Sequence, residues 1–272
     1  MVQSCENVKR FYDEDVDAEW NRLLKARFEF DINRHFIAKY LKPGQKVLDC
    51  GGGPGRYSLW LAEQGCDVTL FDLSEGNVAF AKNKAQQLGL SLCALSGDAR
   101  DLGALKAERF DHILLMGPMY HLLEENDRIA SVNACLSLLK PGGTLSVSFI
   151  SSYAGILYYL REMPEAILKP EVQADYKFME DDLPFSGMAF TDAYFIRQQD
   201  VLPFMEQFPL KTLHHLSSEG IYSPWYQTLQ SQGEEAYQAY LKFAVATCER
   251  ENLLSFAEHF LYIGRKCDKT LY

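Results

Sequence analysis

Residues 47–56 read VLDCGGGPGR, a short apolar run followed by a glycine-rich loop. The apolar run predicts a buried strand, and the residues from about Arg56 to Gln64 have the pattern of a helix. A glycine loop between a strand and a helix brings backbone amides close to a ligand at the carboxyl ends of parallel strands. The stretch therefore predicts an α/β fold with a ligand site at one edge of the sheet.

The spacing of the glycines argues against a dinucleotide site. The pattern G-x-G-x-x-G fails in both registers, because Arg56 or Ser58 stands where the third glycine is required. Asp72 closes the next apolar run, residues 67–72, and a carboxylate there can accept hydrogen bonds from both ribose hydroxyls of a nucleoside ligand. The pattern that remains is D-x-G-x-G-x-G, formed by Asp49, Gly51, Gly53 and Gly55.

Strand-like and helix-like segments alternate beyond this loop. Ser74 is a good N-cap for a helix that runs to Leu88. The alternation predicts an α/β fold with a doubly wound, seven-stranded, mostly parallel sheet. The later segments are strands at about 90–95, 111–116 and 144–150, a helix at 124–140, and two final strands at 210–216 and 259–265 around a helix at about 234–250.

Composition and charge limit the partners. The 272 residues are 47% hydrophobic and 24% charged, which suits one large globular domain. A net charge of −10 repels polyanions and disfavours nucleic acid. The seven scattered cysteines contain no Cys-x-x-Cys, so no metal is expected. No apolar run approaches the ~20 residues of a membrane span, and the acidic N-terminus lacks signal-peptide character, so we expect a cytoplasmic protein with no membrane partner.

Over most of residues 45–150 the sequence resembles the class I S-adenosylmethionine-dependent methyltransferases. Its VLDCGGGPG resembles the first family motif, whose loop wraps the methionine moiety of the methyl donor. The strings LFDLS at 70–74, GDARDL at 97–102 and LLKPGGTL at 138–145 resemble later family motifs in the same order, and HFLYIGRK at 259–266 resembles the final antiparallel strand. The resemblance implies a Rossmann-like methyltransferase fold, S-adenosylmethionine as donor, no metal, and a small-molecule acceptor.

The resemblance also implies how one domain, residues 1–272, is organised. A helical cap over 1–44 precedes a donor-binding core over 45–150. Residues 151–197 are rich in aromatic side chains and methionine, too long for a loop and too apolar for a linker, and are predicted to be a lid that selects the substrate. Residues 198–272 complete the sheet.

The resemblance of GDARDL at 97–102 to the third-strand motif of the family implies two donor contacts. Asp98 would bond the adenine amino group of the donor, and the backbone of Ala99 would pair with the ring. The alternatives are that Asp98 is a turn residue, that Asp49 only orients the loop, and that Tyr12 only packs in the cap. The complete predicted donor-binding set is Asp49, Gly51, Gly53, Gly55, Asp72, Leu73, Asp98, Ala99, Met116 and Tyr12.

The catalytic prediction rests on residues 116–121, MGPMYH, which follow the fourth strand. His121 is the predicted general base, with Tyr120 beside it, because histidine titrates near neutrality. The alternative is that His121 packs against the following helix. The string Gly117-Pro118-Met119-Tyr120 lacks the amide or carboxylate with which nucleobase amine methyltransferases hold the amino group, so we expect a small, partly apolar acceptor.

Other functions stay open at this point. The first is methylation of RNA or protein at a non-amine site. For RNA, a stripe of basic residues would be expected to bind the phosphate backbone. The second is a catalytically silent protein that binds S-adenosylmethionine. An NAD-dependent oxidoreductase is the weakest alternative, because the glycine frame it needs is missing. The sequence sets neither the acceptor nor the oligomeric state.

Overall fold

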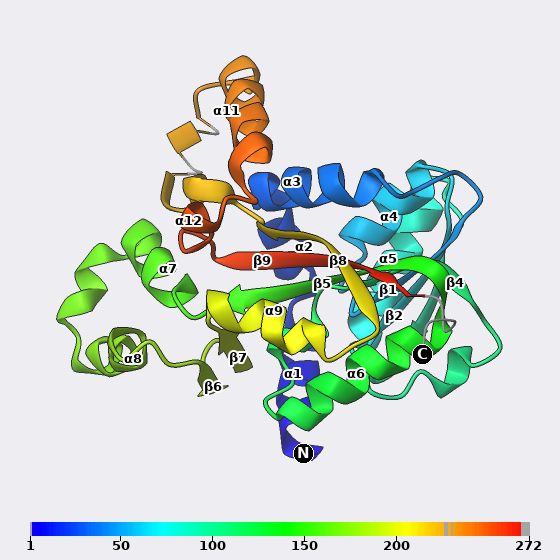
Figure 1. Ribbon diagram of the computed structural model, residues 1–272, viewed down its shortest axis with the longest axis horizontal. Helices are drawn as coiled ribbons and strands as arrows, with labels where there is room; N and C mark the ends of the chain where they lie inside the picture. The colour runs from blue at the N-terminus through cyan, green and yellow to red at the C-terminus, as the bar shows by residue number, and fades with distance from the viewer. Residues whose placement is uncertain (1, 226–227, 230, 268–272) are drawn as a thin grey trace.

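The computed structural model describes residues 2–225, 228–229 and 231–267 (Figure 1). Its centre is a parallel sheet in the order β3-β2-β1-β4-β5, which confirms the predicted doubly wound α/β fold. The strands are β1 (Lys46–Cys50), β2 (Asp67–Asp72), β3 (Cys93–Ser96), β4 (Phe110–Leu115) and β5 (Leu139–Ser151). Between them run α4 (Arg56–Glu63), α5 (Glu75–Gln87), the short η1 (Gly103–Leu105) and η2 (Pro118–Tyr120), and α6 (Glu125–Leu138).

Strand β1 lies in the middle of the sheet, where its apolar residues Val47, Leu48 and Cys50 are fully buried. Leu48 pairs with Thr69 of β2 on one side and with Ile113 of β4 on the other, and its side chain is fully buried. The predicted N-cap of α5 is confirmed, since the Ser74 hydroxyl accepts from the Asn77 amide at 2.9 Å. All these strands point the same way, so the loops after β1, β2 and β4 meet at one edge.

Strand β5 is longer than predicted. It begins at Leu139 instead of residue 144, because Leu139 already pairs with Phe110 and the intervening residues bulge out of the ladder around Gly142, whose φ is +73°. On its far side β5 pairs antiparallel with β9 (His259–Lys266), which pairs antiparallel with β8 (Leu210–Ser217). Both predicted final strands are therefore present. The helices nearby are α9 (Gln198–Glu206), η4 (Gly220–Trp225), α11 (Glu234–Thr247) and α12 (Glu251–Leu254).

The segment predicted as a lid adds two further strands. Within the described residues the sheet has nine strands, two more than the seven predicted. Phe195 of β7 packs on Phe185 of β6 with ring centroids 5.3 Å apart, and β7 pairs with only two residues at the end of β5. Strands this short show no clear alternation in the sequence. The elements are α7 (Ala154–Glu162), η3 (Pro164–Leu168), α8 (Pro170–Glu180), β6 (Phe185–Met188) and β7 (Asp192–Ile196).

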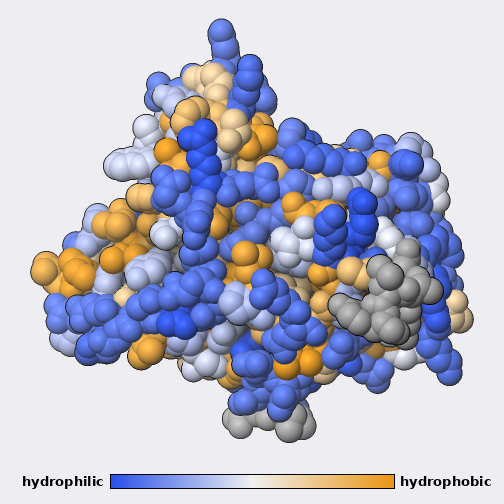
Figure 2. All heavy atoms as spheres, viewed as in Figure 1, coloured by the Kyte–Doolittle hydropathy of each residue, from blue (hydrophilic) through white to orange (hydrophobic). Residues whose placement is uncertain are grey.

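Apolar side chains are exposed at the end of the molecule that α7 and α8 form (Figure 2). Leu160, Ile167 and Leu168 are among them, with Leu168 78% exposed. Despite this apolar surface, none of the helices in the described part of the chain is long and apolar enough to cross a membrane.

Three helices precede the sheet: α1 (Val2–Glu14), α2 (Val16–Lys25) and α3 (Arg27–Ala38). Asp15 caps α2, because its carboxylate accepts from the Ala18 amide at 2.8 Å. Helix α3 is anchored by Phe28, which is 2% exposed and stacks on Tyr237 of α11 at 4.7 Å. Helix α1 contacts α5 and β7, so the N-terminal helices reach across the edge where the strands end (Figure 1).

Candidate functional site

A cavity of about 1180 Å³, including the open space at its mouth, lies at the carboxyl ends of β1, β2 and β4. Its floor comes from the loops after these strands, and its roof comes from α1, α2 and α3. Both predicted catalytic residues and all predicted donor-binding residues except Gly55 line it: Tyr12, Asp49, Gly51, Gly53, Asp72, Leu73, Asp98, Ala99, Met116, Tyr120 and His121. None of the described residues from 151 to 197 lines this cavity.

The glycine loop requires glycine for two different reasons. Gly51 has φ +74°, and a Cβ there would lie 2.3 Å from Cδ of Pro118, so the loop can touch the chain after β4 only without a side chain. Gly55 has φ +92°, and a Cβ there would lie 2.9 Å from Cβ of Ala81 in α5. Gly55 therefore lets α4 begin close against α5 and does not face the cavity, so the structure offers no support for its predicted donor contact.

Asp72 is held by the loop that it faces. Its Oδ2 accepts from the Gly53 amide at 2.8 Å, and its Oδ1 accepts from the Ser74 amide at 2.9 Å and from Asn77 Nδ2 at 3.3 Å. Burial raises the pKa of this carboxyl, although the hydrogen bonds act against the shift. The carboxylate reaches the cavity in a fixed orientation, at the position where the sequence predicts a ribose contact.

Asp49 lies beneath the loop and is only 1% exposed. The hydroxyl of Ser58 donates to its Oδ2 at 2.7 Å, and a Cβ on Gly52 would lie 2.7 Å from its Cγ. Burial raises the pKa of Asp49 to about 6, the Ser58 hydrogen bond notwithstanding. This geometry favours the orienting role over direct contact with a ligand.

Asp98 has a partner that the sequence analysis missed. Arg100 donates from Nε to Asp98 Oδ1 at 3.0 Å and from Nη1 to Asp127 Oδ2 at 2.8 Å. Burial acts to raise the pKa of Asp98, but the hydrogen bonds and charge of Arg100 outweigh it and lower that pKa. Arg100 stands two residues after Asp98, yet nothing in the sequence indicates that it folds back. The predicted contact of Asp98 with an adenine amino group stays a prediction.

His121 connects the floor to the roof. Its Nδ1 lies 3.0 Å from the Asp192 carbonyl oxygen, which can only accept, so Nδ1 carries the proton and Nε2 accepts from the Tyr12 hydroxyl at 2.9 Å. Burial lowers the pKa of His121 to about 4, which keeps the ring neutral. With Nε2 occupied, a base role would have to act through Tyr12, and that role stays a prediction.

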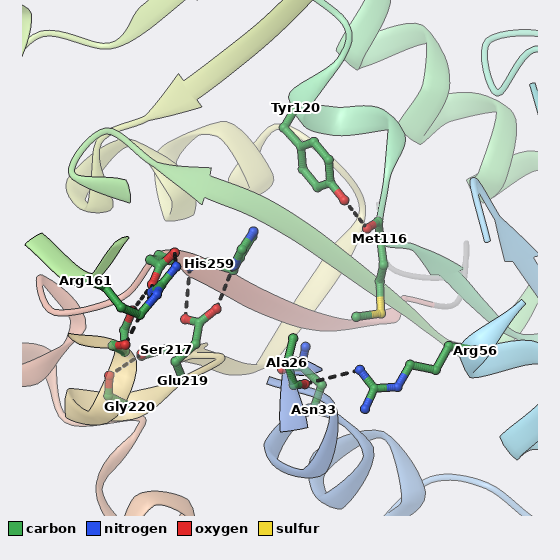
Figure 3. A network of polar contacts seen from close by, with 12 residues as sticks. Ala26, Asn33, Arg56, Met116, Tyr120, Arg161, Ser217, Glu219, Gly220 and His259 are labelled. Atoms are coloured by element: carbon green, nitrogen blue, oxygen red, sulfur yellow. Dashed lines mark hydrogen bonds and ion pairs between the residues drawn. The ribbon is translucent and has the colours of Figure 1, made fainter. Parts of the chain in front are cut away.

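The neighbouring Tyr120 has an occupied hydroxyl as well. It donates to the Met116 carbonyl oxygen at 2.9 Å (Figure 3). Burial raises the pKa of Tyr120, so the phenol stays neutral. Tyr120 lines the cavity, and its hydroxyl holds the chain that follows β4.

A second polar cluster lies where β9 begins. His259 Nδ1 is 2.6 Å from Glu219 Oε1, and the His259 amide donates to Glu219 Oε2 at 3.1 Å (Figure 3). One carboxylate therefore hydrogen-bonds to both the ring and the backbone of His259. Burial disfavours the charged imidazole, but the carboxylates of Glu219 and Glu29 outweigh it and raise the pKa of His259 to about 9. His259 and Glu29 both line the cavity.

The sequence analysis gave His259 no role and did not consider Glu29 or Glu219. Each comes from a different element, namely α3, the turn after β8, and β9, so no local pattern links them. One ligand atom from each of the three lies within 4.8 Å of the others, the one such set of His, Cys, Asp or Glu in the described residues with the spacing to enclose a cation. The Glu219 carboxylate and the His259 imidazolium already neutralise each other without a bound cation.

Comparison with known proteins gives matches in sequence and structure. A family model described as "Methyltransferase domain" matches residues 47–143. A ubiquinone biosynthesis O-methyltransferase of Xanthomonas axonopodis pv. citri is 30% identical over 212 residues, which cover 77% of this chain and 81% of that protein. Another protein of that name, from Cereibacter sphaeroides, is 32% identical over 160 residues and is covered over only 58% of its length.

Among solved structures, magnesium protoporphyrin IX methyltransferase from Synechocystis PCC 6803 with bound SAH has a TM-score of 0.59 at 16% identity. The match covers 97% of this chain and 99% of that one. At this identity the likeness shows a shared fold, and the predicted Rossmann-like fold is confirmed.

Proposed function

This chain belongs to the S-adenosylmethionine-dependent methyltransferases of class I, and on that basis we propose that it transfers a methyl group to an oxygen of a small-molecule acceptor. The observation that carries the proposal is a single cavity that joins the glycine loop and Asp72 to a separate polar cluster at Glu29 and His259. One end suits a nucleoside-bearing donor and the other suits an acceptor. The named relatives are O-methyltransferases, which supports oxygen as the nucleophile.

The donor fits the floor of the cavity. The carboxylate of Asp72 would accept from the ribose hydroxyls, and Asp98, Leu73 and the Ala99 backbone would enclose the adenine. The Gly53 amide already donates to Asp72, so it is the backbone of the loop around Gly51, Gly52 and Gly53 as a whole that would enclose the methionine moiety. Asp49 would support that loop from below through Ser58 and Gly52. When bound, S-adenosylmethionine supplies a methyl group on a positively charged sulfur with a good leaving group.

The protein would lower the barrier mainly by positioning the acceptor oxygen in line with the methyl group. Methyl transfer to oxygen is an in-line displacement, and orientation alone can lower such a barrier by about 7–11 kcal/mol. Tyr57 and Tyr120 line the cavity, and a ring face turned to the positive sulfur would stabilise it by about 0.5–2 kcal/mol. The proposal requires no metal, because the leaving group departs as a neutral thioether.

A small acceptor fits the walls better than a nucleic acid. The cavity is roofed by three helices, and its lining carboxylates outnumber its cationic side chains: Glu19, Glu29, Asp49, Asp72 and Asp98 against Lys9, Arg22, Arg56 and His259. Together with a net charge of −10, these carboxylates would repel a phosphate backbone. We therefore propose a small-molecule acceptor that enters an enclosed site.

We also propose a division of labour within residues 1–272. Residues 45–150 hold the donor, residues 1–44 form the roof, and residues 198–272 supply Glu219 and His259. We propose the roof in place of residues 151–197 for selecting the substrate, because that segment extends the sheet beyond β5 and none of its described residues lines the cavity. Its contacts with the site include the hydrogen bond between His121 Nδ1 and the Asp192 carbonyl oxygen.

The test measures turnover and acceptor class together. The protein is incubated with S-adenosylmethionine and a metabolite extract, and release of S-adenosylhomocysteine is followed before and after nuclease or protease treatment. We expect release that survives both treatments and is lost on removing small molecules. Release that depends on RNA or protein would refute the small-molecule acceptor. Binding of S-adenosylhomocysteine without any release would indicate a silent donor-binding protein.

A further inference from the structure

The Glu29, Glu219 and His259 cluster lies on the side of the cavity away from Asp72. Asp72 ends β2, whereas His259 begins β9, and the sheet places β1, β4 and β5 between those two strands. Four strand spacings of about 4.8 Å separate the two ends laterally. If the proposed function holds and the donor's ribose lies at Asp72, the cluster lies where an acceptor meets the methyl group.

The cluster contains one fixed and one uncommitted group. His259 is fixed, because Glu219 binds its ring at 2.6 Å and its backbone amide at 3.1 Å. Glu29 makes no hydrogen bond or ion pair to any other residue that the structure describes, although it lies in the first turn of α3 and lines the cavity. The charge of Glu29 acts on His259, Arg22 and Arg56 without a hydrogen bond or ion pair to them, so its carboxylate oxygens are available to a ligand in the cavity.

The spacing of the cluster matches one bound hydroxyl. A ring nitrogen of His259 and a carboxylate oxygen of Glu29 lie within 4.8 Å of each other. An oxygen that makes two hydrogen bonds of about 2.8 Å at a tetrahedral angle spans about 4.6 Å between its two partners. Because Nδ1 of His259 is taken by Glu219, Nε2 is the ring nitrogen that would donate to a hydroxyl whose own proton points at Glu29.

We propose that Glu29 and His259 form the acceptor site for a hydroxyl-bearing small molecule, with His259 donating a hydrogen bond to the hydroxyl oxygen and Glu29 accepting its proton, while Glu219 positions His259. The acceptor oxygen forms a bond to the methyl carbon as the carbon–sulfur bond breaks. The electron pair of that bond stays on sulfur, and the hydroxyl proton passes to Glu29. The products are a methyl ether, a neutral thioether and a protonated Glu29.

The number of lone pairs on the acceptor atom favours a hydroxyl over an amine as the methyl acceptor. A hydroxyl oxygen has two lone pairs, so it can accept from His259 with one and attack the methyl group with the other. A neutral amine has a single lone pair, which a hydrogen bond from His259 would occupy. An ammonium group has none and would bind between Glu29 and Glu219 without reacting.

The charge state of His259 fits the role of donor. The groups that face it are Glu219 from the turn after β8, Glu29 from α3, Glu258 beside it in the chain, and the Tyr120 ring at 6.5 Å; Arg161 of α7 pairs with Glu258. The surrounding carboxylates raise the pKa of His259 to about 9, so the ring carries both protons at neutral pH. The hydrogen-bond donor is then lost as the pH rises through about 9.

The experiment uses the full chain with S-adenosylmethionine, with catechol as hydroxyl probe and aniline as amine probe. Formation of S-adenosylhomocysteine gives kcat, and calorimetry gives the Kd of S-adenosylhomocysteine. We expect Glu29→Gln to lower kcat with catechol by about 100-fold or more and to change that Kd by less than about twofold. Glu29→Asp, which keeps a carboxylate, should restore part of the activity and guards against misfolding.

Glu219→Gln tests the positioning role. Its pH–rate profile should lose activity at a lower pH than wild type, because the imidazolium loses its neighbouring carboxylate. The matched control is Glu249→Gln, which removes the carboxylate from another His–Glu pair, His214–Glu249 at 2.7 Å, outside the cavity. That control should leave kcat and the pH profile unchanged.

Several outcomes would overturn the proposal. They are Glu29→Gln with kcat within about threefold of wild type, aniline methylated faster than catechol, or no turnover of catechol by a protein that binds S-adenosylhomocysteine. Activity that EDTA abolishes and Mg²⁺ restores would also overturn it, because the three side chains would then hold a cation. Failure to bind S-adenosylhomocysteine would instead refute the proposed function itself.

Discussion

Replacing Asp49 by asparagine should stabilise the protein at neutral pH. Burial raises the pKa of Asp49 from 3.8 to about 6, so its ionised form costs the native state free energy. A shift of this size corresponds to about 3 kcal/mol, at about 1.4 kcal/mol for each pKa unit. The side-chain oxygen of asparagine can still accept from Ser58 and carries no charge, so Asp49→Asn recovers most of that free energy.

The pH dependence of the effect has a definite sign. Because the native pKa is raised, the favourable contribution of protonated Asp49 is fully present below pH 3.8 and is lost as the pH rises through about 6. Wild type and Asp49→Asn should therefore have equal stability near pH 4 and diverge to a plateau above pH 6.5 or so. At about 2–4 °C for each kcal/mol, the difference in Tm at the plateau is of order 10 °C.

The assay is thermal unfolding of both proteins between pH 4 and pH 8, with Asp67→Asn, an exposed aspartate at the start of β2, as control. Calorimetry with S-adenosylhomocysteine gives a second readout. If Asp49 only orients the glycine loop, the Kd should change by a few-fold at most. Equal Tm values for wild type and Asp49→Asn across the pH range would refute the burial argument, and a loss of affinity above about tenfold would show direct contact with the ligand.

Four further predictions concern the residues that line the cavity. S-adenosylhomocysteine at 100 times its Kd should stabilise the protein by about 2.7 kcal/mol, seen as several degrees in Tm, and NADH should give no shift; the reverse pattern would refute the donor assignment. Asp72→Ala should weaken S-adenosylhomocysteine binding by about 1–3 kcal/mol in calorimetry, since the ribose contacts are lost, and unchanged affinity would mean that Asp72 is misassigned. Tyr12→Phe removes the hydrogen bond to His121 and should speed the release of S-adenosylhomocysteine in stopped-flow without slowing a single turnover. His121→Ala tests the general base, and a normal single-turnover rate in that variant would eliminate His121 from this role.

The floor of the site was predictable from sequence because its signals are local. A glycine loop after a buried strand and an acidic residue at the end of the next strand fix both the fold and the position of the cavity. The helix cap at Ser74 is local in the same way. Such features depend on residues that are close in the chain.

The acceptor end was not predictable, because its residues meet only in three dimensions. Glu29 and Glu219 are separated by most of the chain, and His259 has no distinctive neighbours in sequence. The short strands β6 and β7 were not predicted for a related reason. Their stability comes from the pairing of β7 with β5 and from the packing of the Phe185 ring against the Phe195 ring. Arg100 likewise shows its role only once it reaches Asp127.

The separation of roof from floor has a consequence for how such a protein can change over evolutionary time. The proposed donor contacts lie in residues 49–116 apart from Tyr12, within the segment that the methyltransferase family model matches, whereas the proposed acceptor residues Glu29, Glu219 and His259 lie outside it. Substitutions at the roof and at the start of β9 can therefore exchange one acceptor for another while the methyl-donor machinery is inherited unchanged. Acceptor specificity can in this sense evolve separately, and proteins that inherit the same donor-binding loops can methylate different metabolites.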